Sequence, residues 1–295
     1  MKKKLLIFLG IPLLLLAGFF VYKTIKDRIE EQEYREWVAT LEHTASPNVQ
    51  ILPDTVLIDY LNEKRTLAIY LPTNYESDSV DYPVIYFLDG QSPFDQKIQE
   101  GQEWEIDEVI DSLALLGQEQ AIVVGIYNSE ARMTEYKPFP STRWYSDKSG
   151  TTGDQHAEWI ATDLKAWVDA RYHTKKDPQS TIIAGASLGG LMSYYMLNEF
   201  PEVFGRAIVF SPSYWVNELV YSLHESNPKI KEQKIYFNAG ELETPTVESI
   251  EKMHKILLDY GVPAANMKLD VEAELGHWHM TWNAGFKKAY PWIVQ

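Results

Sequence analysis

The sequence predicts an α/β fold with a mostly parallel central sheet, an antiparallel hairpin at its front and helices on both faces. Short apolar segments alternate with amphipathic ones, which is the pattern of buried parallel strands linked by helices. Two strand-like stretches, 55–61 and 65–71, are separated by the turn residues Asn62-Glu63 and predict the hairpin. Between an apolar segment and a helical one stands Gly185-Ala186-Ser187-Leu188-Gly189-Gly190. A serine between glycines at a strand-to-helix turn is the nucleophile elbow of the α/β-hydrolase fold.

The other elements follow in chain order. Apolar runs predict strands at 84–88, 121–126, 181–184, 207–210, 234–238 and 267–272. Helical spacing predicts helices at 103–116, 156–172, 191–200, 249–260 and 281–294. The stretch 127–154 is rich in Ser, Thr, Gly and Pro. We expect it to be a long loop, and such loops in compact domains are usually functional or mobile.

Composition and charge exclude several classes of protein. The chain has 295 residues and a net charge of −15, which argues against nucleic-acid binding because few basic groups are available to neutralise phosphates. There is no cysteine, so disulfides, thiolate chemistry and cysteine-ligated metals are excluded. Hydrophobic residues make up 45% and charged residues 23%, which is ordinary for a globular protein.

The N-terminus differs in character from the rest of the chain. Three lysines at 2–4 precede an uncharged run from Leu5 to Tyr22, so we interpret residues 1–28 as an uncleaved signal-anchor or transmembrane segment. Residues 29–48 are expected to form a charged stalk and linker, and residues 49–295 the catalytic domain. The lysines place that domain outside the cytoplasm, in the periplasm or at the cell surface. Secretion after signal cleavage is the alternative.

Ser187 is the candidate nucleophile. It is expected at a helix N-terminus, where free N–H groups stabilise a developing negative charge. The main-chain N–H of Leu188 would be one oxyanion donor and that of Gln91, in the loop after strand 84–88, the other. The alternative interpretation of the motif is a glycine-rich turn without chemistry.

The general base and its acid partner should follow the last strands, because the chain order in this fold is serine, acid, histidine. His277 follows a glycine after the last strand, and His279 is its competitor. The His-x-His spacing also suits a metal, but the sequence identifies no third ligand. Glu241 and Glu243 both follow strand 234–238, and either could be the acid.

Several segments together resemble the putative esterase (esterase D-like) family of α/β-hydrolases. Its motifs are matched by Tyr-Pro-Val-Ile-Tyr-Phe-Leu-Asp-Gly at 82–90, by Val-Val-Gly-Ile at 123–126 followed by Arg132, Glu135-Tyr136 and Pro138, and by Ser-Pro-Ser at 211–213. The resemblance covers about residues 50–295. It implies the α/β-hydrolase fold, Glu243 as the acid, and His277 as the base because Trp282 follows five residues later.

The family includes siderophore, feruloyl and acetylxylan esterases, S-formylglutathione hydrolase and mycolyltransferases. The resemblance therefore implies a serine carboxylic-ester hydrolase acting on an aromatic, siderophore or carbohydrate ester. Aromatic residues expected near the site suggest a pocket for such an ester; the candidate substrate-binding residues are Arg132, Trp144, Tyr214, Trp215 and Trp278. Arg132 could instead pair with Glu135 and hold the loop.

The mechanism expected from these residues needs no cofactor and no metal. The partners expected are a small-molecule or glycan ester, and the membrane through the N-terminal segment. Three alternatives remain open: a catalytically silent binding protein with the same fold, an acyltransferase using the same triad, and a serine peptidase.

Overall fold

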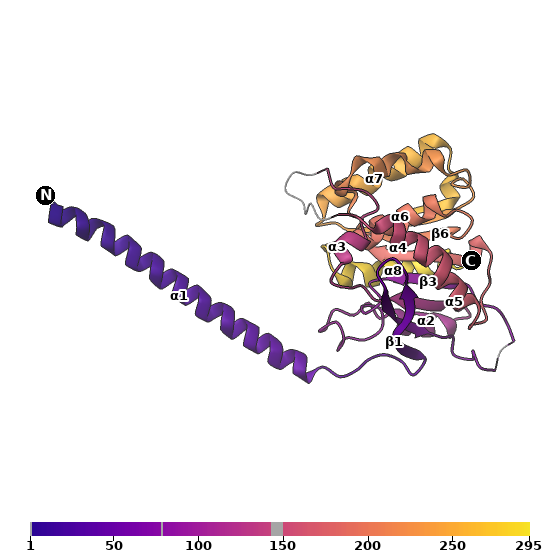
Figure 1. Cartoon of the computed structure of the whole chain (residues 1–295), viewed down its shortest axis with the longest axis horizontal. Coiled ribbons are helices and arrows are strands. Elements are labelled where there is room, and N and C mark those ends of the chain that lie inside the picture. Colours follow the sequence, from indigo (N-terminus) through magenta and orange to yellow (C-terminus); the bar gives the residue numbers. More distant parts are fainter. Residues whose placement is uncertain (1, 78, 143–149) are drawn as a thin grey trace. The chain divides into compact units, whose positions relative to one another are not determined.

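The computed structural model describes residues 2–77, 79–142 and 150–295, with side chains from residue 19 onward. The chain divides into two compact units, Met1–His43 and Thr44–Gln295. The first unit contains the helix α1, Lys2–Thr40 (Figure 1). Its described part includes exposed charged side chains, with Lys26 and Glu30 3.3 Å apart one helical turn from each other. As far as the helices are described, none combines the length and the apolar character needed to span a membrane.

The second unit, which we call the body, is built on one eight-stranded sheet with the order β1-β2-β4-β3-β5-β6-β7-β8. The antiparallel hairpin of β1 and β2 forms one end and joins β4 in antiparallel orientation, while all later neighbours are parallel. Every predicted strand is present. The strands are β1 Val49–Ile58, β2 Glu63–Tyr70, β3 Val84–Leu88, β4 Ile122–Ile126, β5 Thr181–Ala186, β6 Arg206–Phe210, β7 Lys234–Gly240 and β8 Met267–Glu272.

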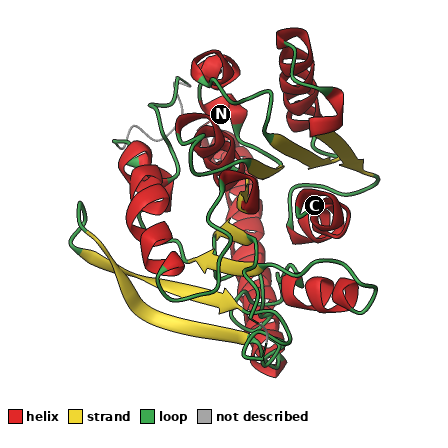
Figure 2. Ribbon diagram, turned by 90° about the vertical axis from the view of Figure 1, so that its right-hand side faces the viewer, coloured by secondary structure: helices red, strands yellow, loops and turns green. Residues whose placement is uncertain are grey.

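Helices cover both faces of this sheet (Figure 2). Their bounds are α2 Ile106–Ala114, α3 Arg132–Glu135, α4 Gly153–Trp159, α5 Lys165–Asp169, α6 Leu188–Glu199, α7 Thr244–Tyr260 and α8 His279–Ile293. Side chains of β3 alternate between two cores, as the period of a strand requires. Tyr86 belongs to the core that includes residues of α4, α6 and α7, and Phe87 to the core that includes residues of α2 and α8.

Two predicted helices differ from those observed. Helix α2 begins at Ile106 rather than at 103, because Glu105 has a left-handed conformation (φ 53°) that a helix cannot include. The single helix expected over 156–172 is α4 and α5 joined by a π-helical segment, Ile160–Leu164. A π turn holds one extra residue, and hydrophobic spacing alone does not reveal it. The expected loop 127–154 contains α3 and the start of α4.

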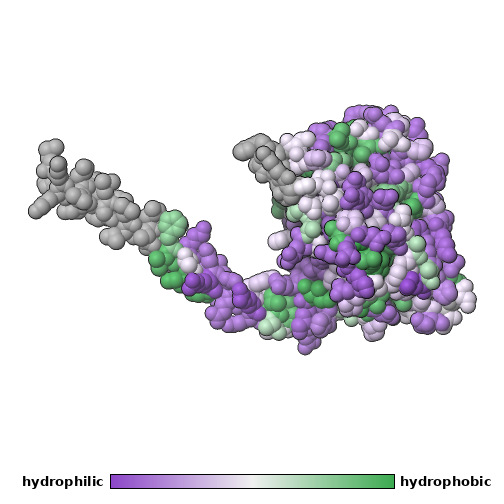
Figure 3. All heavy atoms as spheres, in the orientation of Figure 1, coloured by the Kyte–Doolittle hydropathy of each residue, from purple (hydrophilic) through white to green (hydrophobic). Residues whose placement is uncertain are grey.

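The surface of the body agrees with the acidic composition. Figure 3 shows mostly hydrophilic side chains on the face in view, with smaller hydrophobic areas between them. Ser187, Glu243 and His277 follow the carboxyl ends of β5, β7 and β8. Because β3, β5, β6, β7 and β8 are parallel, their carboxyl ends lie along one edge of the sheet, where α/β proteins bind ligands.

Candidate active site

Ser187 occupies a strained turn between β5 and α6. Its φ of 59° and ψ of −118° are unfavourable for a residue with a side chain. The turn is tight enough that a Cβ on Gly185 would lie 2.8 Å from the carbonyl carbon of Gly189, and one on Gly190 would lie 2.6 Å from the carbonyl oxygen of Phe210. The backbone path therefore requires glycine at 185 and 190, and it places the partly exposed Ser187 at the start of a helix.

Glu243 and His277 form a close hydrogen-bonded pair at the same edge. Oε2 of Glu243, which follows β7, lies 2.5 Å from Nδ1 of His277, which follows β8. The other carboxylate oxygen accepts the Ser211 hydroxyl at 2.7 Å and the Gly240 N–H at 2.9 Å. Burial alone would raise the pKa of Glu243, but the hydrogen bonds from His277, Gly240 and Ser211 outweigh it and hold that pKa below the ordinary value.

Glu241, the other acid that the sequence left open, lies elsewhere. It is exposed, and its carboxylate accepts the main-chain N–H of Glu274 at 2.9 Å. The residue that contacts the imidazole is thus Glu243.

The imidazole of His277 is oriented by more than the carboxylate. The indole of Trp282 stands perpendicular to the imidazole, with ring centroids 5.3 Å apart, and its Nε1–H donates to the Ser211 hydroxyl at 2.9 Å. Trp282, Ser211 and Glu243 therefore form one hydrogen-bonded chain that ends at Nδ1 of His277. With Nδ1 engaged, Nε2 is the nitrogen left for chemistry. The His277 side chain is 45% exposed.

The Ser187 hydroxyl bonds to Ser213 in this structure, with the two Oγ atoms 3.2 Å apart. Among the described residues, no hydrogen bond joins Ser187 to His277. The backbone nevertheless connects them across adjacent strands. Ser187 N–H donates to Phe210 at 3.0 Å, and Ser211 N–H donates to Asn238 at 2.7 Å. Hydrogen bonds of catalytic groups are often long or differently paired before a substrate binds.

Ser187 lines a cavity of about 210 Å³ at this edge. Its wall combines neutral amides and two indoles with the Asp89 and Arg132 side chains. The residues that line it include Gln91, Gln99, Gln102, Asn128, Trp104 and Trp282. His279 lines it too, and its Nδ1 has no hydrogen-bond partner among the described residues. Burial lowers the pKa of His279. Sequence analysis did not select Trp104 or the amides at 99, 102 and 128, because they come from loops with no motif.

The sequence analysis predicted the main-chain N–H groups of Gln91 and Leu188 as oxyanion donors. Neither N–H donates to any group in the described parts of the chain. Leu188 is the first residue of α6, where N–H groups have no partner within the helix, and Gln91 lines the Ser187 cavity. Their role as donors stays a prediction.

The loop that carries Gln91 is held by Asp89 and Arg132. The guanidinium of Arg132 binds the Asp89 carboxylate through two hydrogen bonds of 2.6 and 2.7 Å. Arg132 also lies over the ring of Tyr136, whose hydroxyl accepts the Asp89 N–H at 3.0 Å. The suggested pairing of Arg132 with Glu135 is wrong, because Glu135 forms a buried ion pair with Arg65 at 2.6 Å. Arg132 lines the Ser187 cavity.

The aromatic residues proposed for substrate binding do not share that cavity. Tyr214 is buried and Trp215 is 42% exposed, and both line a second cavity of about 310 Å³ beside the start of α7. Trp278 is 54% exposed and lines neither cavity. Trp144 lies outside the described residues.

The His-x-His spacing does not form a metal site in the described chain. Only one group of acidic or histidine side chains in its described residues is close enough to share an ion, and that group contains neither His277 nor His279.

Comparisons with known proteins identify the family and the fold of the chain. The family model described as "Putative esterase" matches residues 58–295. The protein YbbA of Bacillus subtilis (strain 168) is 27% identical over 240 residues, which cover 78% of this chain and 92% of YbbA.

Solved structures share the fold. A ferulic acid esterase aligns with a TM-score of 0.61 and 18% identity, over 84% of this chain and 98% of that one. Enterochelin esterase from Shigella flexneri aligns with a TM-score of 0.66 and 17% identity, over 85% of this chain and 59% of that one.

Proposed function

This chain belongs to the Putative esterase family, and from that premise we propose that it is a serine carboxylic-ester hydrolase that works through an acyl-enzyme. The observation that carries the proposal is the Glu243–His277 pair at 2.5 Å, at the same sheet edge as the strained Ser187. Serine acyl transfer needs a positioned nucleophile, a base, and an acid that orients the base.

The proposed reaction starts with a rotation of the Ser187 hydroxyl. It leaves Ser213 and turns toward Nε2 of His277, which takes the proton as the oxygen attacks the ester carbonyl. Glu243 keeps Nδ1–H in place and stabilises the imidazolium. The N–H groups of Gln91 and Leu188 stabilise the oxyanion. His277 then protonates the leaving alcohol, and water hydrolyses the acyl-Ser187 ester by the same steps in reverse.

The natural ester that we propose is aromatic, siderophore or carbohydrate in nature. Neutral amides and indoles in the Ser187 cavity suit a ligand that carries hydroxyl groups on a small ring. Relatives of similar fold are named as esterases of ferulic acid and of enterochelin. Purified residues 44–295 should be assayed with acetyl, feruloyl and catecholate esters that all carry the same leaving group. The kcat/KM for one of these ester classes should exceed the kcat/KM for the other two.

Labelling of the nucleophile gives the sharpest test of the chemistry. A fluorophosphonate probe should attach to Ser187 in the wild type and should not attach in Ser187→Ala. His277→Gln should lose at least ~10³-fold in kcat on a p-nitrophenyl ester. The matched control is His254→Gln on α7, which should keep wild-type turnover. Labelling failure in a folded wild type would contradict the proposal and would favour a silent binding protein.

Acyl transfer to an alcohol other than water is the second outcome to distinguish. Both reactions use the same acyl-Ser187 intermediate, so labelling cannot separate them. Addition of a sugar acceptor separates them, because a transferase yields acyl-sugar at the expense of free acid. Hydrolysis predominating at millimolar acceptor supports the esterase, and amide cleavage as fast as ester cleavage would instead indicate a peptidase.

We also propose that the body is exported and held at the membrane by residues 1–28. The uncharged run Leu5–Tyr22 after three lysines supports this. Fractionation of cells that express the full chain tests it. The full chain should remain in the membrane pellet after carbonate washing, a chain from residue 44 should not, and protease added outside the cell or spheroplast should digest the body. Full-length protein in the soluble cytoplasmic fraction would contradict the proposal.

A further inference from the structure

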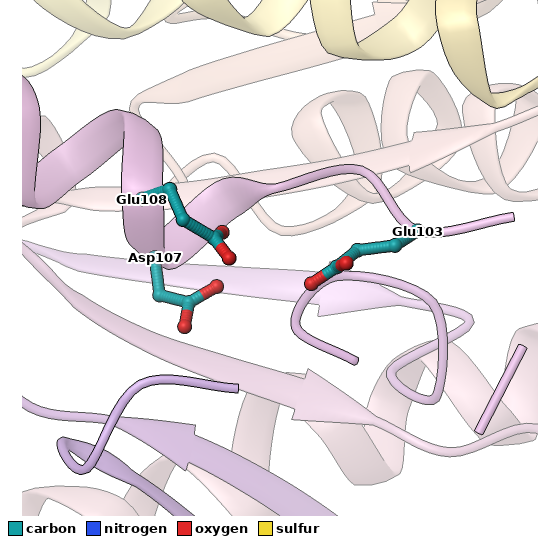
Figure 4. A group of neighbouring side chains, drawn as sticks. All are labelled: Glu103, Asp107 and Glu108. Atoms are coloured by element: carbon teal, nitrogen blue, oxygen red, sulfur yellow. The ribbon is translucent and has the colours of Figure 1, made fainter. Parts of the chain in front are cut away.

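Three carboxylates form a compact group at the start of α2, separate from Ser187. Glu103 precedes the helix, and Asp107 and Glu108 lie in its first turn. One oxygen from each can be chosen so that all lie within 4.8 Å of one another. Figure 4 shows the three side chains directed toward a common space. Like charges this close repel strongly.

Unpartnered oxygens point to a ligand in this space. Asp107 is fully buried and Glu103 is 9% exposed, yet Oδ1 of Asp107 and Oε1 of Glu103 have no hydrogen-bond partner in the described chain. The same holds for Oε2 of Glu108. A buried polar atom without a partner is costly and rare. Three of them belong to three adjacent acids.

Positive charge from the protein is absent at the group. Within the part of the chain that the structure describes, no Lys, Arg or His forms an ion pair with Glu103, Asp107 or Glu108. Lys287, the nearby candidate, pairs with the exposed Glu105 at 3.3 Å. Buried carboxylates are normally paired or coordinate metals.

Other oxygen donors come from the first residues of the body. Thr44 Oγ1 donates to Glu103 Oε2 at 2.7 Å, and Ser46 N–H donates to Asp107 Oδ2 at 2.7 Å. The segment 44–46 thereby brings two hydroxyl oxygens to the carboxylates.

We propose that Glu103, Asp107 and Glu108, with the hydroxyl of Ser46, bind a calcium ion. Calcium prefers six to eight oxygen ligands at 2.3–2.6 Å, so two ligands of one ion are at most about 5 Å apart. The three carboxylate oxygens, which all lie within 4.8 Å of one another, satisfy this limit. The donor set contains only oxygen, which excludes a preference for zinc. The three carboxylates come from a loop and from a helix. Such a set suits the irregular coordination of calcium better than the regular octahedral coordination that magnesium requires.

The ion would link three parts of the body and support the neighbouring cavity. Its ligands come from segment 44–46, from the loop before α2 and from α2 itself. Gln102 and Trp104, on either side of Glu103, line the cavity of Ser187. Calcium should therefore stabilise the fold and fix one wall of that cavity without taking part in chemistry. The inference is independent of the proposed function.

A proton is the competing occupant. Burial, with repulsion from Asp107, raises the pKa of Glu103 to about 7. Burial, followed by the hydrogen bond that protonated Glu108 makes with Asp107, raises the pKa of Glu108 to about 8. Protons and calcium are separated by measuring at pH 8.5, where calcium should still bind.

Thermal unfolding of the full chain tests the proposal directly. At pH 8.5, calcium at about one hundred times its Kd should raise the Tm by roughly 5–10 °C over EDTA. Magnesium at the same concentration should give a much smaller rise. Terbium, which replaces calcium, should show luminescence excited through Trp104, and calcium should quench it by displacement.

Matched variants make the test specific. Asp107→Asn and Glu108→Gln should each abolish the calcium-dependent rise, while their Tm in EDTA should equal or exceed that of the wild type because repulsion is reduced. Glu105→Gln changes a neighbouring acid outside the group and should keep the full rise. The proposal is overturned if the wild type shows no rise, if both variants keep it, or if magnesium equals calcium.

Discussion

The carboxylate of Glu243 lies 2.5 Å from Nδ1 of His277 although the two residues follow different strands of the sheet. The same carboxylate accepts hydrogen bonds from Ser211 and from Gly240. An acid held by three donors stays ionised below its ordinary pKa. It can therefore hold the imidazole in one tautomer over a wide range of pH.

Glu243→Gln should lower kcat by about 10²–10⁴-fold with little change in KM, because an amide neither fixes the required tautomer nor stabilises the imidazolium. The change keeps the size of the side chain, so the fold should survive, as circular dichroism can verify. Glu241→Gln removes the exposed acid two residues away and should leave kcat within about twofold. Equal losses in the two variants would contradict the assignment of Glu243.

The depressed pKa of Glu243 also predicts a dependence of stability on pH. Because the folded-state pKa lies below the unfolded value of ~4.3, the ionised carboxylate stabilises the fold fully above that value. The contribution disappears as the pH falls through the folded pKa. The Tm difference between wild type and Glu243→Gln should thus shrink on acidification, measured by calorimetry between pH 7 and pH 3. A difference that grows at low pH would refute it.

Ser187→Gly should be more stable than Ser187→Ala by about 1 kcal/mol, because glycine adopts a φ of 59° and ψ of −118° without the strain that a Cβ causes. Both variants lack the nucleophile, so activity cannot bias the comparison. Urea unfolding at constant m-value measures the difference. Equal stability would mean that the backbone relaxes in the variants and that the elbow stores no strain.

Gly90→Ala should destabilise the body by about 1–3 kcal/mol or more, since its Cβ would lie 2.2 Å from the carbonyl carbon of Gly125. The same change displaces Gln91, so kcat should fall beyond what the remaining folded fraction explains. Gly150→Ala is the matched control, as a Cβ there meets nothing within 4 Å, and its effect should stay within about 0.5 kcal/mol. Chemical unfolding and kcat are measured on the same preparations.

Arg132→Lys should reduce kcat about tenfold, because an ammonium cannot make the two parallel hydrogen bonds that the guanidinium makes to Asp89. The loop that carries Gln91 then loses its fixed position. Arg171→Lys is a matched control on the surface, where Arg171 covers the ring of Trp167 and donates to the Trp167 carbonyl at 3.2 Å. A rise in KM with unchanged kcat would indicate that Arg132 binds the substrate instead.

The sequence predicted β3 and β4 because fully buried parallel strands are continuous apolar runs, and it predicted the β1–β2 hairpin from its turn residues. It placed Ser187 at a strand-to-helix turn because only glycine fits at 185 and 190. It could not choose between Glu241 and Glu243 from spacing alone, since their different partners depend on the path of the loop after β8. The sequence also could not predict the hydrogen bond between Ser187 and Ser213, because that bond depends on the rotamers of the two side chains.

The structure does not bring Tyr214 and Trp215 into the Ser187 cavity, for a related reason. Tyr214 and Trp215 are close to Ser187 along the sheet edge, but the short helical turn at Tyr214–Val216 directs them to another cavity. The cavity of Ser187 is instead lined by residues of the loop 91–104, which has no periodicity to interpret. The sequence predicted only a helix over 103–116, and the burial of Glu103 and Asp107 becomes known only from the structure.

The order β5, β6, β7, β8 gives Ser187, Ser211, Glu243 and His277 one successive strand each. Neighbouring strands are about 4.8 Å apart, so hydrogen bonding between backbones, rather than any side-chain contact, sets the lateral spacing of these groups. Segments beyond the strand ends can lengthen, shorten or change composition without altering that spacing. Proteins with this sheet can therefore diverge to act on different esters while the spacing between these four residues stays the same.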